Sequence, residues 1–238
     1  MTNYDHFAKF YDAIMGDRSD VIELLQKSLK KHHPAAKTLL ELGCGTGSIL
    51  DGLKTQYQIA GIEKSPEMLK IAQRKLPNSR LEIGDIARYE LGTTFDVIIC
   101  VFDTINHLTN FAKWETMFDA TAKHLAPGGI FIFDMISIER LHKLMAMPTY
   151  TQDIGSLIAD MEIERVSDNE VEWTTTIQEP HPDGTIQVYE DHASEASFQL
   201  NEVIKAVSRR FELINTFDSF HRPATDASDR VYFVARAQ

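Results

Sequence analysis

The sequence predicts an α/β fold in which helices flank a mostly parallel sheet of seven strands, with an antiparallel β meander inserted late in the chain. Three observations support this prediction. Short apolar runs alternate with helical patterns between residues 37 and 134. A turn rich in glycine follows the first run. Over residues 157–191 the pattern changes to an alternation of apolar and polar residues, which is typical of strands with one exposed face.

Five strands are expected in the first part of the chain. Their apolar runs lack polar alternation, as in strands that are covered on both faces. The runs are KTLLEL (37–42), YQIAGIE (57–63), SRLEIGD (79–85), FDVIICV (95–101) and IFIFD (130–134). Strands that alternate with helices imply βαβ units with right-handed crossovers, so the sheet is expected to be Rossmann-like.

Helix signals lie between these strands. Ser65 is a good N-cap, Pro66 suits the first helical position, and Glu67 adds an acid to the first turn. Residues 110–129 carry large apolar side chains at helical spacing, and this helix is expected to stop at Pro127-Gly128-Gly129.

The C-terminal part is expected to contain the meander, a helix over about 198–208, and closing strands near 211–217 and 230–237. We therefore predict a single domain over residues 1–238. Its parts are an N-terminal helical segment (1–33), a cofactor-binding core (35–136 and 195–238) and an inserted antiparallel lid (150–194).

The composition narrows the class of partner. With 24 Lys+Arg against 35 Asp+Glu, the net charge is -11, which disfavours nucleic acid and anionic membranes. Cys44 and Cys100 form no CxxC pair, and nine histidines show no ligand spacing, so no metal site is expected. Reduced thiols and an N-terminus without a signal-peptide pattern predict a cytoplasmic protein.

The stretch LLELGCGTGSIL (39–50) predicts the ligand. Glycines at this edge of a parallel sheet let a ligand press against the backbone. Ser48 stands where a dinucleotide fingerprint has its third glycine, and the lysine of a phosphate loop is absent. A carboxylate at Glu41 would repel a pyrophosphate but would suit a ligand with an ammonium and a sulfonium. These features favour S-adenosylmethionine.

Acids follow the next two strands. Glu63 ends the second strand, where a carboxylate can accept hydrogen bonds from both ribose hydroxyls. Asp85 follows the third strand and could accept from the adenine amino group while Ile86 covers the ring, or it could cap the next turn. Phe102, just past the fourth strand, could pack against the methionine arm or the substrate.

Five blocks of sequence together resemble the successive motifs of class I S-adenosylmethionine-dependent methyltransferases. They are LLELGCGTG, GIEKSPEML, IGDI, FDVIICVFDTINHL and LAPGGIFIFD. The whole-chain layout is also similar to small-molecule members such as the dTDP-amino-sugar N,N-dimethyltransferases. Those enzymes begin with a helix bearing Tyr-Asp, here Tyr11-Asp12, and carry an antiparallel insertion before the final helix.

The resemblance implies a set of cofactor-binding residues. The glycine-loop residues would frame the methionine moiety, with further contacts at the ribose, at adenine and at the methyl-transfer side. Arg18 could pair with the cofactor carboxylate. The implied residues are Tyr11, Arg18, Glu41, Gly43, Cys44, Gly45, Gly47, Glu63, Lys64, Met68, Asp85, Ile86, Val101 and Phe102.

Three residues are candidates for catalysis: His107, Asp103 and Tyr11. His107 follows the fourth strand and could be a general base, a substrate contact or a loop histidine with a satisfied hydrogen bond. Asp103 could instead cap the following turn, and Tyr11 could simply pack the first helix. Asn106 shares the loop and the same ambiguity.

The expected function is transfer of a methyl group to a small-molecule acceptor, at nitrogen or oxygen, by in-line displacement at the sulfonium. The protein would align the nucleophile and remove its water. Two other classes stay open at this point: a non-catalytic S-adenosylmethionine-binding module, and an NAD-linked oxidoreductase with a degenerate fingerprint. The oligomeric state is expected to be a monomer or a homodimer.

Overall fold

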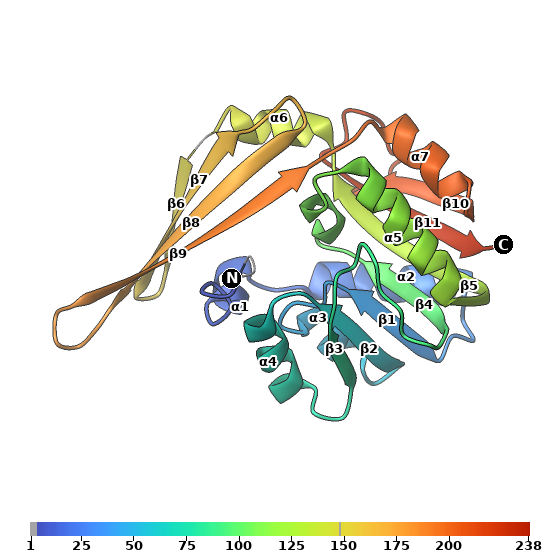
Figure 1. The fold of residues 1–238 in the computed structure, drawn as a ribbon, viewed down its shortest axis with the longest axis horizontal. Coiled ribbons are helices and arrows are strands. Elements are labelled where there is room, and N and C mark those ends of the chain that lie inside the picture. Colours follow the sequence, from blue (N-terminus) through green and yellow to red (C-terminus); the bar gives the residue numbers. More distant parts are fainter. Residues whose placement is uncertain (1–3, 148) are drawn as a thin grey trace.

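A seven-stranded sheet forms the centre of the computed structural model, which describes residues 4–147 and 149–238 (Figure 1). From edge to edge its strands are β10 (Phe211–Asp218), β11 (Arg230–Ala237), β5 (Leu125–Ile136), β4 (Phe95–Cys100), β1 (Thr38–Leu42), β2 (Gln58–Glu63) and β3 (Arg80–Ile83). The first five strands in the chain pair in parallel, and β11 and β10 add antiparallel pairs. The predicted fold class is confirmed.

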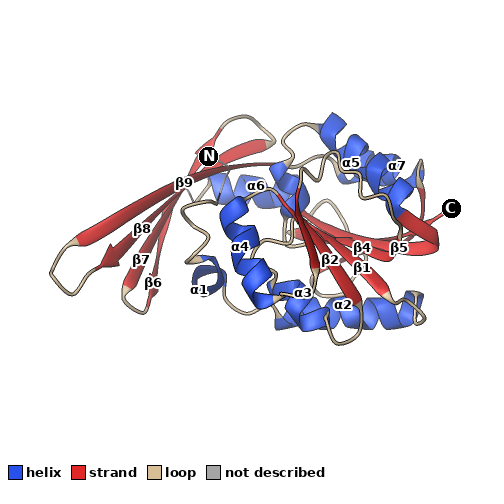
Figure 2. Cartoon of the chain, turned by 60° about the horizontal axis from the view of Figure 1, so that its bottom comes forward, coloured by secondary structure: helices blue, strands red, loops and turns tan. Residues whose placement is uncertain are grey.

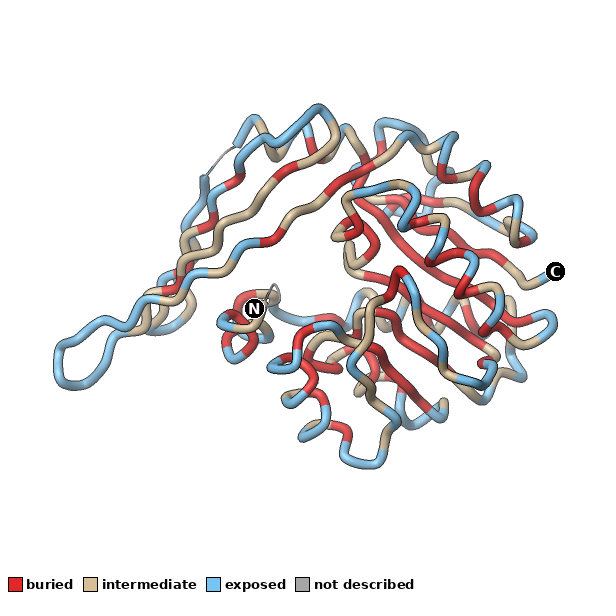
Figure 3. The backbone as a smooth tube through the Cα atoms, in the orientation of Figure 1, coloured by how far each residue is buried: buried red, intermediate tan, exposed pale blue. Residues whose placement is uncertain are grey.

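Helices cover both faces of this sheet (Figure 2). One face packs against α2 (Ser19–His32), α3 (Ser48–Leu53) and α4 (Pro66–Lys75), and the other against α5 (Phe111–His124) and α7 (Leu200–Ser208). Figure 3 shows the buried residues gathered along the strands between the two helix layers. The Ser65 hydroxyl accepts from the Met68 N–H, which confirms the predicted N-cap of α4.

One boundary differs from the prediction. The helix α5 ends at His124, and Pro127-Gly128-Gly129 lies within β5, which begins at Leu125. Leu125 pairs with Phe95 and Ile130 pairs with Val97, so the intervening residues bulge out of the ladder. Gly128 has φ +73°, a conformation that glycine adopts readily, so these three residues kink a strand instead of ending a helix.

The inserted segment forms a separate four-stranded antiparallel sheet, which we call the lid sheet. Its strands are β6 (Thr149–Ile154), β7 (Leu157–Arg165), β8 (Glu170–Pro180) and β9 (Ile186–Ala196). The structure thus extends the expected lid by a residue or two at each end. A helix that the sequence did not predict, α6 (Ile138–Met145), connects β5 to this sheet, and Ser137 caps its N-terminus.

The N-terminal segment lies between the lid sheet and the central sheet (Figures 1 and 2). Phe7, Phe10 and Ile14 form an apolar cluster with Met161 and Ile177 on the inner face of the lid sheet. The segment contains the short helix α1 (Tyr11–Met15), followed by α2, whereas residues 4–10 form turns. Burial of the apolar cluster holds the N-terminal segment beside the carboxyl ends of the parallel strands.

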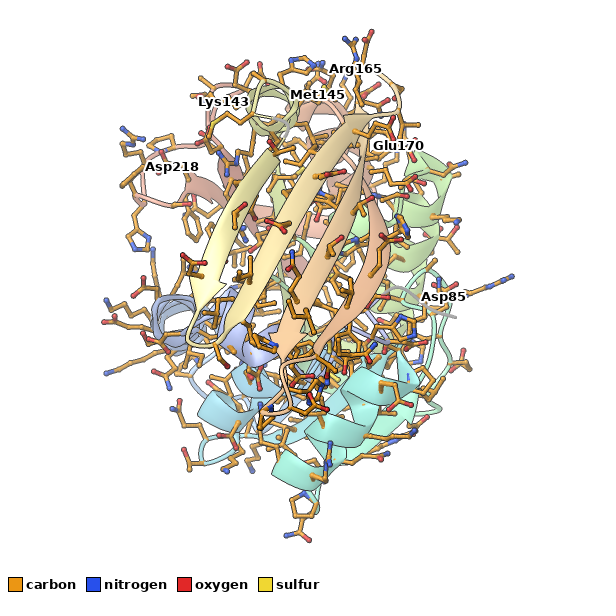
Figure 4. All side chains as sticks on the ribbon, turned by 90° about the vertical axis from the view of Figure 1, so that its left-hand side faces the viewer. Asp85, Lys143, Met145, Arg165, Glu170 and Asp218 are labelled. Atoms are coloured by element: carbon orange, nitrogen blue, oxygen red, sulfur yellow. The ribbon has the colours of Figure 1, made fainter. Side chains whose placement is uncertain are left out.

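Residues on the opposite face of the lid sheet are mostly polar. Figure 4 views this face, with Arg165 and Glu170 at one end of the sheet close to α6, which carries Lys143 and Met145.

Across residues 4–147 and 149–238, no helix is both long enough and apolar enough to cross a bilayer.

Candidate active site

The glycine loop connects β1 to α3 and turns sharply at each glycine. Gly43, Gly45 and Gly47 have φ of +70°, +53° and +78°. The N–H groups of Gly43 and Cys44 donate to the carbonyl of Ile62, at 2.8 and 3.0 Å, which ties the loop to β2. Side chains at these φ values are strained, so the loop requires glycine for its path.

The three glycines have different neighbours. A Cβ at Gly43 would overlap the side chain of Thr104, and one at Gly47 would press on Ala72 and Leu76 of the α4 region. At Gly45 a Cβ would meet nothing within 4 Å. Gly45 therefore leaves space open for a ligand, whereas Gly47 serves the packing of α3 against α4.

This difference gives a matched pair of variants. Both Gly43→Ala and Gly45→Ala place a side chain at positive φ, at a cost of about 1–2 kcal/mol. Only Gly43→Ala adds a steric overlap, so we expect it to lower the free energy of unfolding more than Gly45→Ala does. Chemical denaturation of the two variants measures this. Equal losses would contradict a steric overlap between the methyl group that Gly43→Ala adds and the Thr104 side chain.

Glu63 holds the loop from the end of β2. Its Oε2 accepts from the Gly45 N–H at 2.9 Å, and its Oε1 accepts from the N–H groups of Lys64 and Ser65 at 2.8 Å. An ionised carboxylate offers about four acceptor positions, so this one can still accept a hydrogen bond from a ligand.

A cavity of about 180 Å³, the main cavity, lies beyond the ends of β1, β2 and β4. Parallel sheets bind ligands at this edge, where the strand order reverses between β1 and β4. Most of the predicted site residues line it: Tyr11, Gly43, Gly45, Glu63, Lys64, Met68, Asp85, Ile86, Phe102, Asp103 and His107. Asp85 also accepts from the N–H of Ala87, so it stabilises its own turn as well.

A small cavity adjoins the main cavity and shares Tyr11, Gly43, Gly45, Phe102 and Thr104 with it. Four further predicted residues line it: Arg18, Glu41, Cys44 and Val101. All predicted site residues lie in the described part of the chain. Among them, Gly47 alone lines neither cavity.

The small cavity contains two buried groups of opposite charge. Glu41 is 2% exposed and Arg18 is 6% exposed. Within residues 4–147 and 149–238, Glu41 Oε2 and Arg18 Nη2 have no hydrogen-bond partner, although Arg18 Nη1 donates to the carbonyls of Met15 and Gly16. Burial, reinforced by the nearby charge of Glu63, raises the pKa of Glu41 well above its ordinary value. Groups left unpaired in this way are costly unless a ligand pairs with them.

After β4 the chain turns at two successive residues that are not glycine but have positive φ. Phe102 and Asp103 have φ of +65° and +64°, which is strained for such side chains. The Asp134 carboxylate accepts from both their N–H groups, at 3.0 and 2.9 Å, and Arg230 forms ion pairs with Asp134 and Asp103. The Phe102 ring lies under the guanidinium of Arg18, 4.1 Å from its Cζ. A buried network therefore holds the wall of the site in place.

Asp103 does not cap the following 3-10 turn, η1 (Thr104–His107), through its side chain. Its Oδ1 has no hydrogen-bond partner among the residues that the structure describes. Burial raises the pKa of Asp103 above its ordinary value, against the lowering effect of Arg230 and with a further increase from Asp134. One cation thus serves two carboxylates.

His107 is held at both ring nitrogens. Its Nδ1 lies 3.1 Å from the carbonyl of Ser194, which can only accept, so the neutral ring carries its proton there and donates it. Its Nε2 then accepts from the Tyr4 hydroxyl at 3.1 Å. Glu195 lies 3.8 Å from Nε2. Asn106 hydrogen-bonds the main chain of Ile136 and Ala196, so its role is structural.

Tyr11 lies between the glycine loop and the N-terminal cluster. Its ring is 5.6 Å from that of Phe7 and 6.0 Å from that of Tyr4. Burial raises the pKa of Tyr11 to about 12, although the charge of Arg18 opposes the shift. Tyr11 lines both the main cavity and the small cavity on the side of Arg18.

A third cavity, of about 190 Å³, lies under the lid sheet, and we call it the lid cavity. It shares Tyr4, Met15, Asp103 and Glu195 with the main cavity, so the two meet at these residues. Sequence reasoning missed Tyr4 and Glu195, as well as Arg230 and Asp134. Glu195 lies at the end of a strand with ordinary alternation, which offered no signal of its position.

The methyltransferase domain model matches residues 39–129, from β1 to the bulge of β5. The description of this model is methyltransferase domain, and the match covers the part of the chain that holds the glycine loop. The matched residues of this domain include the glycine loop, Glu63, Asp85 and the strained turn after β4. The resemblance to class I methyltransferases that the sequence motifs indicated is confirmed.

Known proteins are similar to the methyltransferase domain and to the whole fold. A dTDP-4-amino-2,3,4,6-tetradeoxy-D-glucose N,N-dimethyltransferase of Saccharopolyspora spinosa is 35% identical over 139 residues, which are 55% of this chain and 54% of that protein. The chain spans about half the length of the dTDP-amino-sugar relatives that it matches.

Solved structures share the complete fold, including the insertion. An S-adenosylmethionine-dependent methyltransferase from Clostridium acetobutylicum superposes with a TM-score of 0.87 at 20% identity, covering 98% of each chain. The amino pentose methyltransferase CalS10 from Micromonospora echinaspora, solved with S-adenosylmethionine bound, has a TM-score of 0.75 at 21% identity, covering 100% of this chain and 99% of that one.

Proposed function

We propose that this protein is an S-adenosylmethionine-dependent methyltransferase that moves a methyl group to a nitrogen of a small-molecule acceptor by in-line displacement. The observation that carries the proposal is the small cavity. An unpartnered carboxylate oxygen of Glu41 and an unpartnered guanidinium nitrogen of Arg18 line it together. An amino acid with its ammonium and its carboxylate ionised would satisfy both groups.

The main cavity fits the rest of the cofactor. The remaining acceptor capacity of Glu63 suits ribose hydroxyls, and Asp85 with Ile86 suits the edge and the face of adenine. Gly45 leaves open space beside the loop. The solved neighbour CalS10 binds S-adenosylmethionine, which supports this choice of cofactor.

When bound, S-adenosylmethionine supplies a methyl group that its positive sulfur has already activated. The residues of the chain then align the acceptor and exclude water, which contributes about 7–11 kcal/mol in well-oriented reactions. Phe102, held by Asp134 and Arg230, forms a rigid wall at the junction of the cavities. The N-terminal segment and the lid sheet cover the site from the opposite side (Figure 1).

The state of the two predicted bases favours nitrogen over oxygen as the acceptor atom. His107 Nε2 is occupied by the Tyr4 hydroxyl, and Asp103 is paired with Arg230. A hydroxyl needs a base in order to attack, whereas an amine attacks as its free base and loses its proton afterwards. The relatives named as N,N-dimethyltransferases act on amines, which agrees with this choice.

Isothermal titration tests the cofactor directly. We expect S-adenosylmethionine and S-adenosylhomocysteine to bind the full chain and NAD not to bind. Binding of NAD alone would favour the oxidoreductase hypothesis. No binding of either sulfur compound to the folded protein would overturn the proposal.

The Glu63→Gln variant tests the ribose contact. We expect its affinity for S-adenosylhomocysteine to fall by about 1–3 kcal/mol, because a carboxylate acceptor of hydroxyl donors is replaced by a neutral amide. Glu67→Gln is the matched control, since Glu67 lies nearby on α4, half exposed and paired with Lys70. Unchanged affinity in Glu63→Gln, or an equal loss in both variants, would remove the assignment.

Four expectations from the sequence stay predictions. They are a small molecule as the acceptor, the absence of nucleic-acid substrates, a monomeric or homodimeric state, and a cytoplasmic location. The acidic net charge of -11 supports the second of them.

A further inference from the structure

The lid cavity contains three carboxylates, and each has a partner within the protein. Asp103 pairs with Arg230, Asp191 accepts from the Phe7 N–H, and Glu195 accepts from the indole N–H of Trp173 at 3.1 Å. Each carboxylate thus already has one partner in the protein, although Asp103 Oδ1 has none among the described residues.

Arg140 is the exception among the charged groups of the lid cavity. It lies in the first turn of α6, is partly buried and lines the cavity. Within the described ranges 4–147 and 149–238, its guanidinium has no ion pair and no hydrogen bond, whereas the partly buried Arg210 and Arg230 both pair with carboxylates. An unpaired guanidinium is unexpected in a chain with 35 acids and only 24 basic residues.

The surroundings hold Arg140 at the cavity. Its main-chain N–H donates to the Ser137 hydroxyl, and Leu141 packs with Ile163 and Val171 of the lid sheet. Burial raises the pKa of Tyr150, and the charge of Arg140 lies close enough to oppose this shift. The helix turn that carries the guanidinium is therefore anchored to the wall of the cavity.

The cavity also offers an aromatic wall. Tyr150 and Trp173 line it with their ring centroids 6.5 Å apart in an edge-to-face arrangement. A guanidinium with its donors in a planar fork binds oxyanions such as phosphate and carboxylate in a bidentate manner. The combination is suited to a ligand with a compact anionic group beside an apolar or ring-shaped body.

We propose that Arg140 forms an anion-binding subsite of the lid cavity, so that the methyl acceptor carries a phosphate or carboxylate group in addition to its nitrogen. That the ligand of this subsite is the methyl acceptor rests on the proposed methyltransferase function. The anion subsite itself rests only on the unpaired guanidinium and the cavity around it.

Titration of the full chain with inorganic pyrophosphate and, separately, with malonate tests the subsite. Trp173 lines the cavity and Trp114 is fully buried in the core, so tryptophan fluorescence reports occupancy, and calorimetry measures the affinity independently. Both titrations are carried out with S-adenosylhomocysteine present, which would occupy Arg18. Stronger binding of pyrophosphate would indicate a phosphate group in the acceptor, and stronger binding of malonate a carboxylate.

We expect Arg140→Gln to weaken the binding of the preferred anion about tenfold or more, because a hydrogen bond to a charged group typically contributes that much to affinity. Arg140→Lys should retain part of the affinity. Arg74→Gln is the matched control, because Arg74 is exposed on α4 and also lacks an ion pair among the described residues. Binding of neither anion, or equal binding by Arg140→Gln and wild type, would overturn the proposal.

Failure of this proposal is distinguishable from failure of the proposed function. If S-adenosylhomocysteine does not bind but pyrophosphate binds in an Arg140-dependent way, the subsite stands and the methyltransferase function falls. If the cofactor product binds and neither anion does, the reverse holds.

Discussion

The Glu41→Gln variant is expected to bind S-adenosylhomocysteine about 10- to 100-fold more weakly than wild type, the range given by a hydrogen bond to a charged group. Glu41 Oε2 is buried and has no hydrogen-bond partner in the described part of the chain, so a ligand ammonium would be its counterpart. Glutamine keeps the shape of the side chain but removes its charge. Calorimetry measures the change.

Adenosine provides the matched control ligand, because it lacks the amino-acid part. We expect Glu41→Gln to bind adenosine as wild type does. Equal weakening for adenosine and S-adenosylhomocysteine would show that the substitution disturbs the glycine loop instead of removing a contact with the ammonium.

The same substitution has an opposite effect on stability. Burial raises the pKa of Glu41 in the folded protein above its unfolded value, so the folded state binds the proton more tightly than the unfolded state does. The stability contributed by this protonation is present below the unfolded pKa and is lost as pH rises through the folded pKa. Glu41→Gln should therefore have a higher Tm than wild type at about pH 8, with the difference shrinking toward about pH 4.

Thermal unfolding of the protein without ligand, across this pH range, checks the prediction. A Glu41→Gln variant that is less stable than wild type at alkaline pH would mean that the carboxylate has a partner in the folded chain. It would also remove the physical basis for placing a ligand ammonium there.

The Arg230→Gln variant is expected to be destabilised by about 3–5 kcal/mol at neutral pH, because removing one partner of a buried ion pair leaves a charge uncompensated. Here two carboxylates, Asp103 and Asp134, lose the cation that they share. The strained turn at Phe102 also loses part of its support. Denaturant unfolding measures the free energy, and kcat with a working acceptor should fall as well.

Acidic pH should reduce this defect. The pKa of Asp103 is already raised by burial, and loss of Arg230 would raise it further. The penalty of Arg230→Gln is thus largest above the folded pKa of Asp103 and becomes smaller as pH falls through it toward about pH 5, where Asp103 binds a proton.

A double variant separates charge from packing. If the charge of Asp103 causes the loss, Asp103→Asn should recover part of the stability of Arg230→Gln at neutral pH. Additive losses in the double variant would contradict the coupling of the two side chains, as a double-mutant cycle would show.

Local patterns were sufficient to predict the core. The apolar runs of β1, β2 and β4 and the cap at Ser65 lie within short windows, and backbone sterics and burial act at that range. The prediction from local pattern was wrong about the end of α5, because Pro127-Gly128-Gly129 can end a helix or kink a strand. The pairing of Leu125 with Phe95, which no local pattern specifies, decided between them.

The glycine loop and the acids at the strand ends were also readable, because parallel topology places the carboxyl ends of strands at one edge. The partners of these residues were not. Tyr4 meets His107 across 103 positions of the chain, and Arg230 meets Asp103 across 127. Such contacts depend on how the N-terminal segment and β11 fold back onto the site.

By itself the sequence thus determined the order of the elements and the residue types at the ligand-binding edge, because periodicity, capping and glycine conformations are local properties. Only the tertiary structure decided which of these side chains are free to act. It paired His107 and Asp103 with distant partners. Among the described residues it left Oε2 of Glu41, Nη2 of Arg18 and the guanidinium of Arg140 without a hydrogen-bond partner. Desolvation and pairing of charges depend on the whole packed molecule, and no short stretch of chain encodes them.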